Sequence, residues 1–401
     1  LCIMQKKLSL IIILLSSIYF ISQFSRASLG VVIIDIAADL NLNSEQIGRL
    51  GGIFFLSFAL TQVPLGIILD ALNPIKIIIY MMFIVFSGSF LFGIADNYSL
   101  LILARILQGV GCGVCLMGPL VVLTKILGAK DFALYSGIVM GLGGLGALFA
   151  TEPFFYIVSQ VGWGSAFYYF SFLILFLIFF LYLFPKEKKL ETESKTDFNF
   201  KAFKKILFNK NFLLMLPMSM FGYASAAFIL TLWGGKFLSS VHNFNIENIS
   251  LILMFMALFW TLGSFSYGYI EKKINNKKLI ITFSSLIMAF LISLLCLSII
   301  NNKIFFLILF CLLGFFGAFT LILISHYRVL FEEAIIGKVL TTANLFNFFG
   351  VFIIQWLTGI IIFNLNEKYG FSITTSYNIA FLMIIVCLLI STIFYLRTDE
   401  K

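Results

Sequence analysis

Long uninterrupted apolar runs are the feature that most constrains the fold of this chain. Residues 170–184 read FSFLILFLIFFLYLF, without a charged side chain. Across the 401 residues, 61% are hydrophobic and only 11% are charged, against roughly 25% charged in soluble domains. A soluble protein of this composition could not cover its surface with polar groups, so lipid must surround most of it. Because the runs lack the alternation of a barrel strand, the sequence predicts an all-α integral membrane protein.

Twelve transmembrane spans, at about 20 residues each, account for most of the length. They are predicted at residues 8–36, 46–70, 75–95, 99–126, 132–159, 165–184, 211–238, 247–270, 278–300, 304–330, 335–363 and 376–397. The only long polar stretch, residues 185–210, separates the sixth span from the seventh. Spans four and ten resemble each other weakly and align Gly109 with Gly314. We therefore expect two pseudo-symmetric six-helix halves, residues 1–184 and 211–401, joined by a linker.

The linker and the charges predict the orientation of the chain. Of the 27 Lys and Arg residues, 21 fall on the side of the predicted membrane that carries the linker and both termini. By the positive-inside rule this side is cytoplasmic, and the expected location is a cell inner (plasma) membrane. Residues 185–210 form either a short amphipathic helix on the inner membrane surface or a disordered tether. The net charge of +9 is interpreted as a basic surface beside lipid headgroups rather than a nucleic-acid site, and we expect a monomer.

Motifs of enzymes and of ATP-driven pumps are absent from the sequence. It contains no P-loop, no HExxH and no Ser/His/Asp arrangement or zinc spacing, so we expect neither an enzyme nor a bound cofactor or metal. Cys112 and Cys115 form a C-x-x-C within a glycine-rich span that has no histidine nearby. Packing of small residues explains that pair better than metal or redox chemistry.

Three motifs together resemble those of the major facilitator superfamily. The turn after the second span reads Gly66-x-x-x-Asp70-x-x-Asn73-Pro74-x-Lys76, which is similar to the signature loop of that family, with Ala71 and Asn73 where the family often has Arg and Gly. The fourth span carries Arg105-x-x-Gln108-Gly109, another family pattern. The fifth span, Gly137-x-x-x-Gly141-x-Gly143-Gly144-x-Gly146, resembles the glycine-rich helix of antiporters, with Leu142 where that motif has Pro. The order of these motifs and the topology agree over the whole chain.

The resemblance implies a secondary transporter that works by alternating access. In this family spans one, four, seven and ten line the central path, and the loop motif closes the cytoplasmic side. Gly66, Asp70 and Lys76 would then belong to a cytoplasmic gate. Gly66 would allow close approach of helices, and the Asp70 carboxylate would bind a neighbouring helix N-terminus or a base. The alternative for Asp70 is a solvated loop acid.

Charged residues inside the spans require an explanation, because each costs at least roughly 2.5 kcal/mol at the helix centre. Arg26 in the first span shares one helical face with Tyr19 and Gln23, at i, i+4 and i+7. This polar stripe suits a water-filled cavity. The resemblance implies substrate binding by Arg26, since several anion-transporting branches use an arginine of the first span. The alternative for Arg26 is a buried ion pair. Tyr19, Gln23 and Arg105 are expected to support Arg26 in binding the substrate, and for Arg105 a structural role is an equal alternative.

The fifth span carries Glu152 beside Pro153, where the helix is weakened. The carboxylate either takes up a proton and couples transport to a proton gradient, pairs with an arginine (Arg105 among them), or faces lipid. The second half offers neutral polar groups for substrate instead, namely Tyr223, Asn344 and Asn347. For Tyr223 the alternative is a packed aromatic residue of the core.

The two arginines and one glutamate give the spans a net charge of +1, which favours an anionic or zwitterionic solute. The predicted function is a permease that moves an organic acid or amino acid, as a symporter with protons. One alternative is an exporter of amphipathic or toxic compounds, to which the abundant Phe and the glycine-rich fifth span would be suited. The second alternative is a membrane receptor that does not transport. Such a receptor needs a loop large enough to bind a partner protein, and only the linker of residues 185–210 is long enough.

Overall fold

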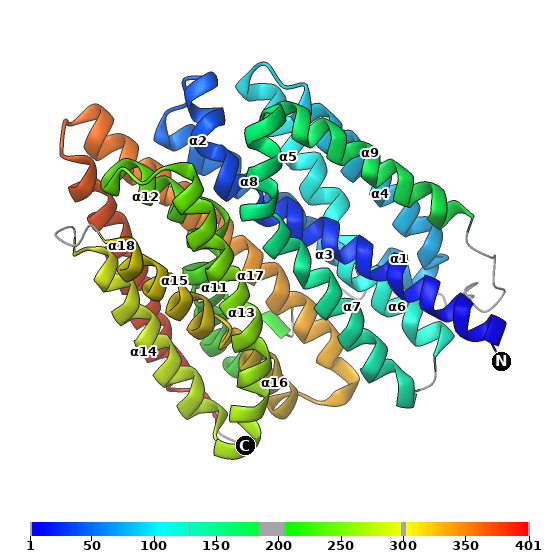
Figure 1. Cartoon of the computed structure of the whole chain (residues 1–401). Helices are drawn as coiled ribbons and strands as arrows, with labels where there is room; N and C mark the ends of the chain where they lie inside the picture. Colours follow the sequence, from blue (N-terminus) through cyan, green and yellow to red (C-terminus); the bar gives the residue numbers. More distant parts are fainter. Residues whose placement is uncertain (1, 128, 184–203, 205, 298–301, 400–401) are drawn as a thin grey trace. The chain divides into compact units, whose positions relative to one another are not determined.

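The computed structural model describes residues 2–127, 129–183, 204, 206–297 and 302–399. Side chains are described for all of these except residues 2–8, 70, 129, 130, 133, 333 and 334. The described chain folds into helices joined by short loops (Figure 1). It divides into two compact units, one formed by residues 1–28 and 56–198 and the other by residues 29–55 and 199–401.

The first unit contains most of the helices of the first half of the sequence. These are α1 (Cys2–Ala27), the later part of α3 (Ser44–Ala71), α4 (Pro74–Gly93), α5 (Tyr98–Cys112), α6 (Val114–Ile126), α7 (Ala129–Phe149), α8 (Glu152–Val161) and α9 (Trp163–Tyr182). Helix α1 packs on α7, and α4 packs on both α5 and α9.

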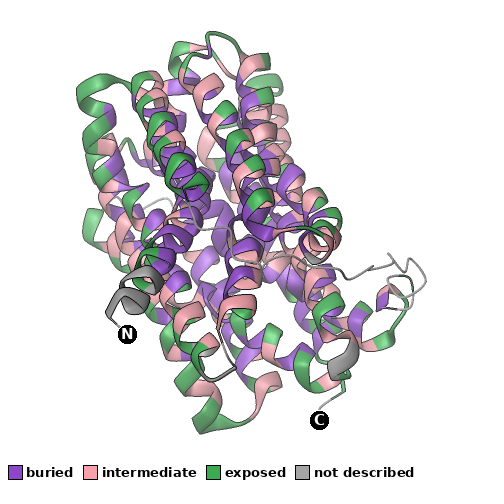
Figure 2. Ribbon diagram, turned by 90° about the vertical axis from the view of Figure 1, so that its right-hand side faces the viewer, coloured by how far each residue is buried: buried purple, intermediate pink, exposed green. Residues whose placement is uncertain are grey.

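The second unit contains the remaining helices. These are α2 (Leu29–Asp39), the first part of α3, α11 (Lys210–Phe228), the π-helical turn η2 (Ile229–Trp233), α12 (Gly234–His242), α13 (Ile246–Ile274), α14 (Lys277–Leu295), α15 (Lys303–Gly317), α16 (Thr320–Leu330), α17 (Glu333–Ile362), the π-helical turn η3 (Phe363–Lys368) and α18 (Ile373–Tyr395). Helix α13 packs on α15, and α11 packs on α17 and α18. Buried faces line the inside of each bundle, and exposed apolar faces lie outside it (Figure 2).

The predicted membrane spans are confirmed by the helices. Eleven helical segments of the described chain are long and apolar enough to cross a membrane, and a twelfth is obtained if the bent pair Leu134–Phe149 and Glu152–Val161 is one span. That pair coincides with the predicted fifth span and is bent by 45°. The break falls at Thr151, directly before the Glu152-Pro153 dipeptide, because a proline ring and its missing N–H interrupt the helix that precedes it.

Asparagine is the residue that begins many of these helices. Its side chain accepts a hydrogen bond from the first-turn backbone of α4, α5, α11, α13, α14 and α15, through Asn73, Asn97, Asn209, Asn245, Asn276 and Asn302. This satisfies N–H groups that have no partner within the helix. Asparagine therefore caps the start of six of the described helices.

Residues 29–55 lie with the second unit, so the unit boundary crosses the first two spans. The predicted halves, residues 1–184 and 211–401, stay a prediction. The predicted linker falls almost entirely outside the described residues, and with it the amphipathic helix or tether. Of residues 185–210 the structure describes only Lys204 and the segment from Ile206.

Candidate functional site in the transmembrane helices

A chain of hydrogen bonds runs along one face of α1, on the three residues that helical spacing brings together. Arg26 Nη1 donates to Gln23 Oε1 at 3.3 Å, and Gln23 Nε2 donates to the Tyr19 hydroxyl at 3.0 Å. The Arg26 guanidinium carbon lies 4.5 Å from the centroid of the Phe58 ring, a cation–π geometry. Arg26 and Tyr19 are each 8% exposed. The predicted stripe therefore forms one oriented polar array whose basic end is Arg26.

Arg105 is fully enclosed and ties α5 to α1. Its Nη1 donates to the backbone carbonyl of Ser25 at 2.8 Å and to Gln108 Oε1 at 3.0 Å, and the side chain is 1% exposed. The bond to Ser25 reaches the residue adjacent to Arg26, so Arg105 holds the end of α1 that presents the polar array. This geometry corresponds to the structural alternative for Arg105, and its direct contact with substrate stays a prediction.

Glycines of α7 create the space that the α1 array occupies. A Cβ at Gly143 would collide with the Tyr19 ring, and one at Gly146 would collide with the backbone oxygen of Phe20. By contrast, a Cβ at Gly137, Gly141 or Gly144 would have no described atom within 4 Å. Part of the glycine pattern that resembles antiporters thus allows α7 to approach α1 closely.

Glu152 lies in the first turn of α8, directly after the bend in the fifth span. Its side chain is half-buried. Two residues further on, Phe154 packs edge-to-face on Phe24 of α1, with ring centroids 4.7 Å apart. The helix that carries the acid therefore contacts the helix that carries Arg26, while the role of the acid stays a prediction.

The loop motif after the second span is only partly described. Asp70 lies in the last turn of α3, but its side chain is not among those that the structure describes. Asn73 caps α4 by accepting from the backbone N–H of Ile75 at 3.0 Å, and Lys76 is exposed in the first turn. A Cβ at Gly66 would have no described atom within 4 Å, and its role in close helix approach stays a prediction.

In the second unit the predicted polar residues have partners within the helix bundle. Tyr223 packs edge-to-face on Trp260 and Phe348, at centroid distances of 5.8 and 5.4 Å, as its aromatic alternative predicts. With its amide oriented to satisfy both polar atoms, Asn347 donates to the backbone oxygen of Ser219 at 2.7 Å. Asn344 is half-buried on the same helix. Arg26 belongs to the other unit, and a substrate site shared by these three residues and the α1 array stays a prediction.

A polar link that the sequence did not single out connects α17 to the π-helical turn η2. Gln355 Nε2 donates to Thr231 Oγ1 at 2.8 Å, and Trp233 Nε1 donates to the backbone oxygen of Gln355 at 3.1 Å. The side chains of Gln355 and Trp233 are fully buried. Single π-helical turns within α-helices occur frequently at functional sites, and this one lies in the seventh span.

The first part of α3 is held to η3, the π-helical turn that follows α17, by a contact that sequence reasoning missed. The Glu367 carboxylate accepts from the backbone N–H of Ser44 at 3.0 Å and from its hydroxyl at 2.7 Å. A carboxylate at a helix N-terminus is stabilised by the N–H groups and the helix dipole. We call this the Ser44–Glu367 latch. The end of the unit at which it lies, with the loops at residues 40–43 and 369–372, is called the distal end.

Glycines bring the same two helices into backbone contact below the latch. A Cβ at Gly48 would lie 2.5 Å from the oxygen of Gln355 and 3.1 Å from the Cα of Gly359. In the same way, a Cβ at Gly30 of α2 would lie 2.7 Å from the oxygen of Leu230. The glycines at positions 48, 51 and 52 were a readable signal, because small residues in a span indicate a helix–helix interface.

The cysteine pair of α5 and α6 shows packing within the bundle. Cys112 and Cys115 are both fully buried, and Cys115 Sγ lies 3.9 Å from the Met82 sulfur. Within the described parts of the chain, no three His, Cys, Asp or Glu side chains group in a way that could hold a metal ion.

Comparison with known proteins finds a transporter family and individual transporters as relatives. The sequence profile of the Major Facilitator Superfamily matches residues 15–328. The chain is 25% identical over 295 residues to "Sodium-dependent phosphate transport protein 1, chloroplastic" of Arabidopsis thaliana, covering 68% of this chain and 56% of that protein. It is 22% identical over 268 residues to "Probable L-galactonate transporter" of Escherichia coli (strain K12), covering 62% and 58%. In both cases it spans less than two thirds of the relative's length.

The fold agrees with solved transporter structures. A bacterial homologue of the human lysosomal transporter Spinster, in an inward-facing and occupied conformation, superimposes with a TM-score of 0.78 at 17% identity, over 98% of this chain and 97% of that one. Because the profile match covers more than half of the residues, and the helices and their order agree with it, this chain belongs to the major facilitator superfamily.

Proposed function

We propose that this chain is a secondary transporter of a small anionic or zwitterionic metabolite, such as an organic acid or amino acid, and that protons drive it. The observation that carries the proposal is the α1 array, in which Gln23 and Tyr19 orient a buried Arg26. A guanidinium held in this way offers a fixed fork of N–H donors to a carboxylate or phosphate. The names of two relatives, which refer to phosphate and L-galactonate, support an anion.

Alternating access is proposed to act through the contacts of α3 with α17. The Ser44–Glu367 latch and the Gly48 contact close the distal end of the second unit in this conformation. Residues 29–55 are continuous in sequence with helices of the first unit. Opening the distal end would therefore require these contacts to break. The positive-inside rule predicts that both termini lie on the cytoplasmic side of a bacterial inner membrane, and in that orientation the distal end faces outward.

Glu152 is the proposed proton carrier. A half-buried carboxylate at a helix bend can change its solvation when the helices move, and loss of water favours the protonated form. The gate residues Gly66, Asp70 and Lys76 are proposed to act at the cytoplasmic side, as the family resemblance implies. Tyr223, Asn344 and Asn347 are proposed to contribute neutral contacts to substrate when the path is open.

Uptake into proteoliposomes tests the anion proposal. Purified protein is reconstituted, and uptake of a panel of labelled organic anions, amino acids and cations is measured under an imposed pH gradient. We expect Arg26→Ala to abolish uptake of the anion and Arg26→Lys to retain part of it, because lysine keeps the charge but lacks the planar fork. Lys303→Ala, which removes an exposed charge at the start of α15, serves as the matched control. Full transport and affinity in Arg26→Ala would refute the anion site.

Coupling is tested separately with Glu152→Gln. If Glu152 carries the proton, this variant loses uptake driven by the pH gradient but still exchanges labelled for unlabelled substrate. Loss of both activities would indicate a structural role for the acid, and retention of gradient-driven uptake would exclude coupling through it.

The exporter alternative loses one of its arguments in this structure. Gly143 and Gly146 are accounted for by the approach of α7 to α1, so the glycine-rich fifth span does not by itself favour antiport. The α1 array favours a defined polar ligand over a range of amphipathic compounds.

A further inference from the structure

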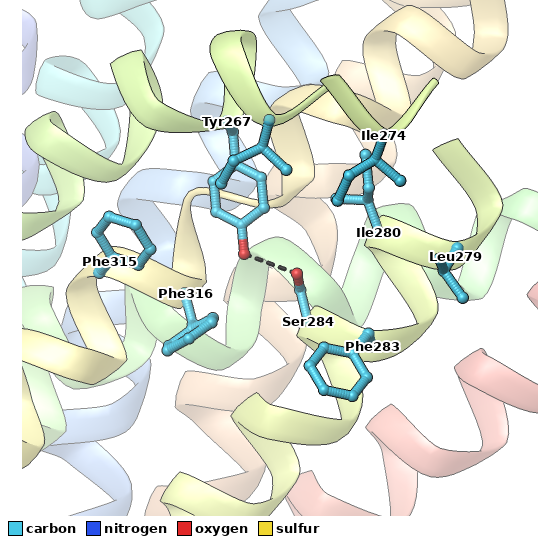
Figure 3. A pocket seen from close by; sticks show the side chains of 9 residues that line it. Tyr267, Ile274, Leu279, Ile280, Phe283, Ser284, Phe315 and Phe316 are labelled. Carbon is cyan, nitrogen blue, oxygen red and sulfur yellow. Dashed lines mark hydrogen bonds between the residues drawn. The ribbon is translucent and has the colours of Figure 1, made fainter. Parts of the chain in front are cut away.

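A cavity of about 400 Å³ opens between α13, α14 and α15, within the second unit (Figure 3). Ile274 and Tyr267 come from α13, Leu279, Phe283 and Ser284 from α14, and Phe315 from α15. The volume lies within the range of ligand sites, roughly 300–1,000 Å³. We call this the α13–α14 groove.

The floor of the groove offers no polar group to a ligand. Its two hydroxyls, those of Tyr267 and Ser284, bond to each other at 2.6 Å, as the dashed line in Figure 3 shows. Tyr267 is 2% and Ser284 4% exposed. The remaining lining is hydrocarbon and aromatic. Such a surface suits a hydrocarbon chain and disfavours a polar solute, which would lose its hydrogen bonds to water without replacement.

The sides of the groove are open to the surroundings of the bundle. Ile274, Leu279 and Phe283 are 47%, 56% and 64% exposed. In a membrane protein, apolar side chains with this exposure on the outside of a helix bundle contact lipid. An acyl chain of the adjacent leaflet can therefore enter the groove from the side, without passing through water.

One end of the groove is flanked by a dense group of lysines. Lys272 and Lys273 end α13, and Lys277 and Lys278 begin α14, so that the four lie within one or two residues of the groove residues Ile274 and Leu279. The only acid of this turn, Glu271, binds Lys277 at 3.3 Å and accepts from the Ser325 hydroxyl. Lys278 donates to the backbone oxygen of Thr398 at 3.0 Å.

These bonds divide the lysines into two kinds. Lys277 and Lys278 are half-buried and hold the turn in place, whereas Lys272 and Lys273 are exposed. With four lysines and one glutamate, the turn carries an excess of three positive charges. Basic clusters of this kind at the end of a membrane helix attract anionic headgroups.

We infer that the α13–α14 groove binds an anionic phospholipid, with one acyl chain in the groove and the phosphate beside Lys272 and Lys273. The apolar lining and the positive turn adjoin at Ile274 and Leu279, as the acyl chain and the headgroup adjoin in a phospholipid. The inference does not depend on the proposed function, because it concerns a surface distant from the α1 array in sequence and in the other unit. The positive-inside rule assigns this lipid to the cytoplasmic leaflet.

Native mass spectrometry of the purified full chain tests the inference. The protein in detergent is titrated with dioleoyl phosphatidylglycerol or dioleoyl phosphatidylcholine, and the dissociation constant of the first bound lipid is measured. We expect phosphatidylglycerol to bind more tightly. Replacing Lys272 and Lys273 together by alanine is expected to weaken phosphatidylglycerol binding by about 25-fold, since each lysine near an anionic surface contributes about fivefold. Phosphatidylcholine binding should change little.

Two further variants separate the groove from the charges. Ile274→Trp places a large ring at the exposed mouth of the groove and is expected to weaken phosphatidylglycerol binding at least tenfold while all lysines remain. The control replaces Lys303 and Lys338, both exposed and away from the groove, by alanine and should bind as the unmodified chain does. Thermal unfolding in detergent verifies that each variant is folded.

Three results would overturn the inference. Equal affinity of the unmodified chain for the two lipids would show that the headgroup is not recognised. Normal phosphatidylglycerol binding in Ile274→Trp would show that the acyl chain does not occupy the groove. Complete competition by glycerol 3-phosphate would indicate a site for a free anion rather than for a membrane lipid.

Discussion

Removing the negative charge of Glu367 should weaken closure of the distal end. In Glu367→Gln the side chain keeps one oxygen for Ser44 but loses the charge that faces the N-terminus of α3. An exposed charge at a helix end contributes about 0.3–1 kcal/mol, which corresponds to a shift of about two- to fivefold in the equilibrium between the closed and open distal end. Because salt screens exposed charges, the shift should be larger at low ionic strength.

Distances between spin labels measure that equilibrium. Ala38 at the end of α2 and Phe371 in the loop before α18 are both exposed and can be replaced by labelled cysteines in a background without the native cysteines. Electron–electron resonance then gives the populations of short and long distances. Glu367→Gln should increase the long-distance population two- to fivefold relative to the short one.

A double-mutant cycle and a matched acid make the test specific. If Ser44 and Glu367 act together, Ser44→Ala combined with Glu367→Gln should give less than the sum of the two single effects. Glu247→Gln removes an exposed acid from the first turn of α13 and should leave the distribution unchanged. An unchanged distribution in Glu367→Gln, or the same shift in Glu247→Gln, would refute the latch.

Two other predictions concern packing in the first unit, and both are read from thermal unfolding in detergent. Gly146→Ala should destabilise the protein by about 1–3 kcal/mol, because its Cβ meets the backbone oxygen of Phe20 and an overpacked helix interface must shift. Gly144→Ala, with no described atom near its Cβ, should instead be neutral or stabilising by up to about 1 kcal/mol. Equal effects of the two would contradict the packing. Arg105→Ala should cost about 1.5–3 kcal/mol for each hydrogen bond it loses, and normal stability with abolished uptake would instead indicate substrate contact.

The membrane spans could be predicted from the sequence because each is a local property of about 20 consecutive residues. Hydrophobicity alone places them, and Pro153 marks the bend in the fifth span. The α1 array could be predicted for the same reason, since Tyr19, Gln23 and Arg26 follow the helical repeat of a single helix. Its hydrogen bonds require no contact with a distant part of the chain.

Contacts between distant segments could not be predicted in this way. Glu367 follows the predicted eleventh span in a polar segment that carries no motif, and its partner Ser44 is 323 positions away. The hydrogen bond from Asn347 to the backbone oxygen of Ser219 joins α17 to α11, and the sequence does not reveal this partner. A single sequence shows which residues share one face of a helix, but not which faces of two helices pack together. For Gly66, no described atom lies within 4 Å of a Cβ placed there.

The backbone contact of Gly48 with Gly359 has a consequence for the speed of the transport cycle. Long side chains that interlock lose rotamer freedom when an interface forms, and this loss of conformational entropy costs about 0.5–2 kcal/mol for each side chain. Two glycines have no rotamers to lose, so this part of the α3–α17 interface can form and separate without reordering side chains. The closure of the distal end can therefore rely on backbone shape at this point, and such an interface is suited to being opened and closed many times.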